Sequence, residues 1–98
     1  MNKRDVRLPS PAEMEILDLL SSKEMYGLQM VKSSKRLTRG GIYVMLNRME
    51  EKGLVSSRVK ESDSSCGRRV YKITGQGRRA YALRSAAEAA YDALPVIA

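Results

Sequence analysis

The sequence predicts a small α+β domain that is mainly helical and contains one β-hairpin. Two patterns support this class. Apolar residues recur every three to four positions up to about residue 52 and again after residue 76, as on one face of a helix, whereas two short segments in between alternate like strands. The 98 residues fit one domain of modest core size, and such a chain gains stability by burying more surface against a second subunit.

The first helix is expected over residues 11–20, in the segment PAEMEILDLL. Ser10 can cap this helix, Pro11 suits its first position, and Glu13 follows the serine by three residues, which is the capping-box arrangement. Its core-facing residues are expected to be Ile16, Leu17 and Leu20.

The second helix is expected within EMYGLQMVKSSKR, residues 24–36, with Tyr26, Met30 and Val31 near its inner side. Gly27 costs a helix interior about 1 kcal/mol relative to alanine. We therefore expect this glycine to permit a close crossing with another helix.

The third helix is expected after RLTRGG, residues 36–41, where two glycines interrupt the pattern and Thr38 can cap the helix. It should end near Gly53, because glycine suits the left-handed position that follows a helix. The turn between the second and third helices is as short as in a helix-turn-helix unit. Its core-facing residues recur with helical spacing and are Ile42, Met45, Leu46 and Met49.

Two strands follow the third helix. They are expected in LVSSRVK, residues 54–60, and in RRVYKIT, residues 68–74, and the polar segment ESDSSCG joins them. The result is a hairpin with basic residues along its strands.

The last helix is expected over residues 76–94 and is stopped by Pro95. Its small and apolar residues repeat like the seam of a short coiled coil, and Tyr81 and Tyr91 widen the apolar surface beyond what the first three helices could cover. This pattern predicts self-association as a homodimer. The dimerisation residues are expected to be Ala80, Leu83, Ala87, Ala90, Tyr91 and Leu94.

Composition excludes several classes of function. The chain has no histidine and a single cysteine, so we expect no structural metal, no cofactor and no enzymatic acid–base chemistry. No apolar run reaches the roughly 18 residues of a membrane span, and no signal-peptide pattern precedes the first helix, so we expect a cytoplasmic protein.

The net charge of +7 is concentrated in one part of the chain. Residues 58–84 contain eight basic and two acidic residues, a local charge of +6. Such a cluster is typical of a protein that binds a polyanion, because neutralised phosphates release condensed counterions; a solvated basic face kept for solubility is the alternative.

The order of three helices, hairpin and helix is that of a winged helix, in which the third helix enters the major groove of DNA and the hairpin forms the wing. We expect Thr38, Arg39 and Tyr43 to meet phosphates, and Gly40 and Gly41 to let the start of the helix approach the sugar-phosphate backbone.

On the same outward face, Val44 and Asn47 should reach base edges, since asparagine can bind adenine and valine can contact a thymine methyl. Arg48 either contacts a phosphate or pairs with Glu50 or Glu51. The expected wing contacts, to phosphates or in the minor groove, are Lys60, Arg68 and Arg69.

Three segments resemble the PadR family of bacterial transcriptional regulators: YGLQM (residues 26–30), LTRGGIYVMLNRMEEKGLV (residues 37–55) and GRRVYKITGQGRRA (residues 67–80). In that family a Tyr-Gly pair starts the second helix, a G-(S/T)-(L/I)-Y segment starts the recognition helix, and R-x-Y-x-(L/I)-T-x-x-G leads from the wing into the last helix. The resemblance covers about residues 17–80.

This resemblance implies a dimeric repressor that binds a palindromic operator and dimerises through its C-terminal helix. Residues 1–75 would then form the winged helix-turn-helix DNA-binding domain, and residues 76–98 the dimerisation helix. The resemblance carries DNA contact onto Gly41, Tyr43, Val44, Asn47, Arg48, Lys60, Arg68 and Arg69. Family members can respond to phenolic acids or flat hydrophobic drugs, but the final helix offers only Tyr81 and Tyr91 as aromatic residues, so little in the sequence supports an effector pocket.

Two further hypotheses stay open at this stage. The winged helix could serve mainly for protein–protein contact, with its basic wing facing an acidic partner. Alternatively, Cys66 at the expected wing tip could act as a redox switch, since Arg68 and Arg69 nearby would lower the pKa of its thiol, although a lone cysteine in such a loop usually has no such role.

Overall fold

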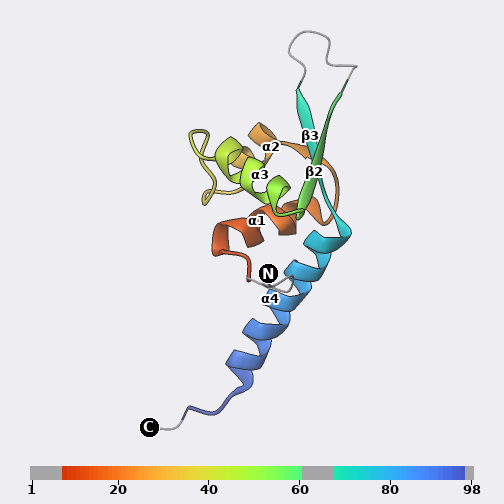
Figure 1. Cartoon of the computed structure of the whole chain (residues 1–98). Helices are drawn as coiled ribbons and strands as arrows, with labels where there is room; N and C mark the ends of the chain where they lie inside the picture. The colour runs from red at the N-terminus through yellow and green to blue at the C-terminus, as the bar shows by residue number, and fades with distance from the viewer. Residues whose placement is uncertain (1–7, 61–67, 97–98) are drawn as a thin grey trace.

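The computed structural model describes residues 8–60 and 68–96 and shows an α+β winged helix (Figure 1). Within these ranges the elements follow the order α1 (Pro11–Leu20), β1 (Met25–Tyr26), α2 (Gly27–Ser33), α3 (Ile42–Glu51), β2 (Val55–Val59), β3 (Arg69–Ile73) and α4 (Gly75–Ala93). The predicted fold class is confirmed, with one additional strand.

Helix α1 has the predicted bounds and the predicted cap. The Ser10 hydroxyl accepts a hydrogen bond from the Glu13 backbone N–H at 3.2 Å, and a Glu13 carboxylate oxygen accepts one from the Ser10 N–H at 2.9 Å. Ile16, Leu17 and Leu20 are buried, as predicted from their spacing.

The predicted second helix over residues 24–36 was wrong at both ends. Met25–Tyr26 forms a strand that pairs antiparallel with β3, because the outer edge of β3 would otherwise leave backbone groups unpaired. The helix then stops at Ser33, and the chain turns through extended Ser34 so that Leu37 enters the core. A two-residue strand is too short to produce a detectable period.

Helix α3 begins at Ile42, and Gly41, not Thr38, occupies its N-cap position. Thr38 instead closes the turn ahead of the helix: its hydroxyl accepts from the Gly41 N–H at 3.1 Å, and its carbonyl accepts from Ile42 N–H at 3.0 Å. The predicted N-cap, Thr38, was therefore wrong by three residues. Gly53 follows the helix with φ of +80°, the left-handed conformation predicted for it.

The hairpin is confirmed, with each strand one residue shorter at both ends than predicted. Val55 pairs with Ile73 and Val59 with Arg69 in antiparallel register, and the sheet order is β1-β3-β2. The segment that joins β2 to β3, which contains Cys66, lies outside the described residues, so the redox hypothesis is not addressed by the fold.

The core lies between the sheet and the first three helices, and it also receives the first turns of α4. Ile42, Leu46 and Met49 of α3 are fully buried, and Tyr71 of β3 is 2% exposed, which raises the pKa of its phenol through burial. Ala80 and Tyr81 of α4 pack against this core.

Helix α4 begins at Gly75 and packs against α1, and its C-terminal half then extends away from the winged part, on the opposite side from the hairpin (Figure 1). The Tyr81 hydroxyl donates to an Asp18 carboxylate oxygen at 2.7 Å, which ties the two helices together and raises the pKa of Tyr81. Across residues 8–60 and 68–96, none of the helices combines the length and the apolar character needed to cross a membrane.

Candidate nucleic-acid interface

The outward face of α3 carries an unusual set of side chains for a solvated helix. Tyr43 is 45% exposed and Val44 is 54% exposed, and Asn47 lies exposed one turn after Tyr43. These residues lie opposite the buried Ile42 and Leu46, so helical periodicity alone aims them outward.

Arg48 is exposed in the last turn of α3, and within the described residues it forms no ion pair with Glu50 or Glu51. Glu50 instead accepts hydrogen bonds from the Ser57 hydroxyl at 3.0 and 3.2 Å. Arg48 is therefore not paired with either glutamate, and its guanidinium is accessible for contact with a phosphate.

Gly27 at the start of α2 permits close contact with α3 through one side chain. A Cβ atom at this position would lie 2.8 Å from Cε1 of Tyr43, which is closer than carbon atoms pack. The expected close crossing therefore exists, and its partner is the Tyr43 ring.

The loop end of the hairpin is linked to β1 and α3. The Arg69 guanidinium donates to the Ser57 hydroxyl at 3.2 Å, and the same hydroxyl donates to Glu50 of α3. The Arg68 guanidinium lies over the Tyr26 ring, 5.5 Å from its centroid, in a cation–π contact. Lys60 is exposed at the end of β2, and its N–H donates to the Arg68 carbonyl.

A cavity of about 510 Å³ lies between the wing, the start of α3 and helix α2; we call it the wing cavity. It brings together four of the predicted contact residues: Arg39, Tyr43, Arg68 and Arg69. Five more residues line it from β1 and α2: Tyr26, Leu28, Gln29, Val31 and Lys32. Sequence reasoning treated this second segment as structural only, and the YGLQM motif was the signal that could have placed it at the site.

The remaining predicted positions do not line this cavity. Thr38 and Gly40 lie in the exposed turn before α3, and a Cβ atom at Gly40 would meet nothing within 4 Å. Gly41 is half-buried, with the Thr38 hydroxyl 3.2 Å from the place where its Cβ would be. Through Arg39, Tyr43, Arg68 and Arg69, the wing cavity brings together the turn before α3, α3 itself and the wing.

Comparison with known proteins agrees with this arrangement. The model of the "Transcriptional regulator PadR-like family" matches residues 16–83, about two thirds of the chain. The chain belongs to the PadR-like family. The resemblance carried by the three sequence motifs is thereby confirmed, and the family regulates transcription.

Solved structures of other regulators share the fold of this PadR-like chain. A PadR family transcription regulator from hypervirulent Clostridium difficile R20291 is 28% identical with a TM-score of 0.69, covering 78% of this chain and 84% of that one. A PadR-like transcription factor from Bacteroides fragilis is 25% identical with a TM-score of 0.76, covering 83% and 82%. A transcriptional regulator from Thermoplasma acidophilum is 27% identical with a TM-score of 0.64, covering 88% and 92%. A comparison with curated protein sequences found no match.

The basic side chains that lie together in space are not the same set as the basic residues that cluster in the sequence over residues 58–84. Arg58 forms an ion pair with Glu24 at 2.7 Å, and Arg84 forms one with Glu88 at 2.9 Å. Their charges are therefore partly neutralised away from the wing cavity, while Arg39, from outside the cluster, lines it. The tertiary structure assembles the basic surface from two separate parts of the chain.

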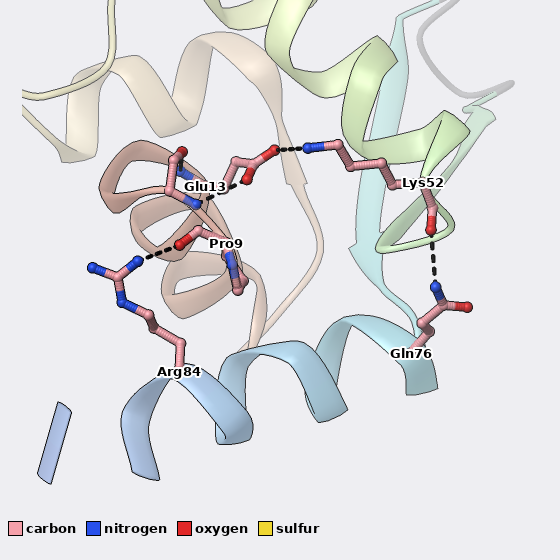
Figure 2. Close-up of polar contacts among 6 residues, drawn as sticks. Pro9, Glu13, Lys52, Gln76 and Arg84 are labelled. Carbon is pink, nitrogen blue, oxygen red and sulfur yellow. Dashed lines mark hydrogen bonds and ion pairs between the residues drawn. The ribbon is translucent and has the colours of Figure 1, made fainter. Parts of the chain in front are cut away.

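Polar contacts link the end of α3 to α1 and α4, and link α4 to the residue Pro9 ahead of α1. Lys52, which follows α3, donates from its Nζ to Oε2 of Glu13 at 2.8 Å, and Gln76 donates to the Lys52 carbonyl at 3.0 Å (Figure 2). Arg84 donates to the Pro9 carbonyl in the same region (Figure 2). Burial alone would raise the pKa of Glu13, but Lys52 and the Ser10 N–H outweigh it and hold the pKa below 4.5.

The predicted dimerisation residues fall into two groups in the single chain. Ala80 packs on the core, Ala87 is half-buried, and Ala90 is exposed. Leu83, Tyr91 and Leu94 are 44%, 77% and 65% exposed, an unusual exposure for large apolar side chains. Tyr81 packs on the core of its own chain, so the prediction that it adds to the unmet apolar surface was wrong, because Asp18 is within reach of its hydroxyl.

Proposed function

We propose that this PadR-like regulator binds a palindromic DNA operator as a homodimer and represses transcription by blocking access to the promoter. The observation that carries the proposal is the shared face of α3 and the wing. There Tyr43 of α3 lines the wing cavity together with the cations Arg39, Arg68 and Arg69. The exposed Val44 directly follows Tyr43, and the exposed Asn47 lies one helical turn after it. Base-reading groups beside phosphate-binding groups are the two components of sequence-specific DNA recognition.

Each predicted contact residue takes a distinct part. Thr38, Arg39 and Tyr43 contact phosphates around the start of α3, where Gly41 gives the backbone room. Val44 and Asn47 contact base edges in the major groove, and Arg48 contacts a phosphate further along. The wing residues that contact phosphates or the minor groove are Lys60, Arg68 and Arg69.

In this proposal residues 1–75 form the DNA-binding domain and residues 76–98 supply the dimerisation helix. The exposed Leu83, Tyr91 and Leu94 along α4 support it, because pairing two such helices removes their apolar surface from water. The small side chains of Ala87 and Ala90 let the helices approach closely. Each dimer would place two copies of α3 in successive major grooves, about one helical turn apart.

Selection of binding sites from random duplexes tests the proposal. We expect a palindromic consensus that the protein binds about 10³-fold more tightly than a scrambled duplex, at two salt concentrations. Recovery of no consensus, together with weak binding that disappears in salt, would refute it and favour a winged helix used for protein–protein contact.

A further inference from the structure

The wing cavity combines positive charge with aromatic walls. Four cationic side chains line it, namely Lys32, Arg39, Arg68 and Arg69, and none of its nine described lining residues carries a carboxylate. The nearest negative charge in this hydrogen-bonded network is Glu50, which Arg69 reaches only through the Ser57 hydroxyl. The cavity therefore favours a ligand with more than one negative charge.

The same cavity has room and surface for a planar ring. The phenol rings of Tyr26 and Tyr43 form part of its wall, and Leu28 and Val31 add apolar area. A volume of about 510 Å³ lies within the roughly 300–1,000 Å³ of pockets that hold small ligands. Tyrosine rings and guanidinium planes stack on flat aromatic groups, while arginine also binds phosphate with two parallel hydrogen bonds.

Nucleotides combine the two features that this cavity favours, namely a planar ring that can stack on aromatic side chains and a negatively charged phosphate that can bind arginine. We propose that the wing cavity binds a free nucleotide, with its base against the tyrosines and its phosphate on the arginines. This assignment goes beyond DNA binding, because the occupant is a separate small ligand.

Binding of the nucleotide would compete with DNA, a consequence that rests on the proposed function. Arg39, Tyr43, Arg68 and Arg69 belong both to the cavity wall and to the proposed DNA contacts. One set of cations cannot bind the phosphate of a nucleotide and the phosphates of DNA at once, so a bound nucleotide lowers affinity for the operator.

The test uses the full chain and three probes: AMP, adenosine and ribose 5-phosphate. Equilibrium dialysis should show AMP binding about tenfold or more tightly than adenosine, which lacks the charge, and than ribose 5-phosphate, which lacks the ring. AMP should also release labelled duplex DNA from the protein, as measured by fluorescence anisotropy. Equal binding of AMP and ribose 5-phosphate would overturn the proposal, because the rings of the cavity would then contribute nothing.

A pair of matched variants locates the site. Leu28 lines the cavity and is 37% exposed, so Leu28→Glu places a repelling carboxylate there without opening the core. Leu8 is 48% exposed and lines no part of the wing cavity, so Leu8→Glu makes the same change of charge elsewhere. We expect Leu28→Glu to abolish AMP binding and Leu8→Glu to leave it within about twofold. Unchanged AMP binding in Leu28→Glu would place the nucleotide elsewhere and overturn the proposal.

The DNA measurements on these variants separate this proposal from the proposed function. Leu28→Glu should weaken DNA binding as well as AMP binding, because the cations that it approaches serve both ligands; DNA binding that stays unchanged in Leu28→Glu would refute the proposed competition. A protein that binds specific DNA but not AMP refutes the nucleotide site alone. A protein that binds AMP in the cavity but no specific DNA refutes the proposed function and supports the nucleotide site.

Discussion

Replacing Gly77 with alanine should destabilise the protein, because the added methyl group of α4 would collide with Leu54, just before β2, and with Ile73 of β3. A Cβ atom at position 77 would overlap the backbone carbonyl oxygen of Leu54 and would lie 2.8 Å from Cγ1 of Ile73. Ordinary carbon–carbon contacts begin at about 3.5 Å, so the Ile73 side chain alone would have to move by roughly 0.7 Å. The Leu54 oxygen cannot move freely, because it accepts a hydrogen bond from Thr74 at 3.1 Å.

Overpacking of this kind costs about 1–3 kcal/mol, and we expect the upper end of that range because one of the overlapping atoms is backbone. The matched control is Gly75→Ala, two residues earlier in the same helix. Nothing lies within 4 Å of a Cβ atom there, so alanine should leave stability unchanged or raise it by about 0.5 kcal/mol. Urea denaturation followed by circular dichroism measures both. Equal midpoints for the two variants would refute the steric reasoning.

Three further predictions concern the polar support of α3, the DNA contacts and the dimer. Glu13→Gln should lower the free energy of unfolding by about 1 kcal/mol at pH 7, because it removes the ion pair with Lys52, whose half-exposed ammonium is partly screened by water. Since the folded pKa of Glu13 is lowered, this contribution is fully present above the ordinary value of 4.5 and is lost as the pH falls through the folded value; a difference between the two proteins that persisted at pH 2 would contradict the assignment. Asn47→Ala should relax sequence preference, whereas Arg69→Ala should weaken all duplexes similarly and reduce the salt slope by about one; uniform losses in both would show that Asn47 does not read bases. Tyr91→Glu should shift the protein from dimer to monomer in sedimentation equilibrium, because it places a charge on the exposed face of α4, and an unchanged mass would remove that residue from the proposed interface.

Local signals predicted a large part of this fold. The capping box at Ser10 and Glu13 set the start of α1, because both hydrogen bonds form between residues three positions apart. The apolar spacing of Ile42, Leu46 and Met49 identified the buried face of α3, and with it the outward position of Val44 and Asn47. Patterns of this kind depend on neighbours within one or two turns of chain, so the sequence contains them directly.

Other features depended on partners far away in the chain. Met25–Tyr26 is a strand only because β3 offers it an edge, and Thr38 closes a turn whose shape is set by the burial of Leu37 and Ile42 on either side. The sequence contains no periodic signal for either, since each involves only two to four residues.

The sequence by itself therefore determined the fold class, the family and the outward face of α3, because these follow from local periodicity and from motifs read in order. Only the tertiary structure decided which charges act together. It paired Arg58 with Glu24 and Arg84 with Glu88, and it placed Arg39 beside Arg68 and Arg69 around one cavity. Electrostatic interactions act through distances in space, and chain folding changes those distances far more than it changes the separation of neighbours along a helix.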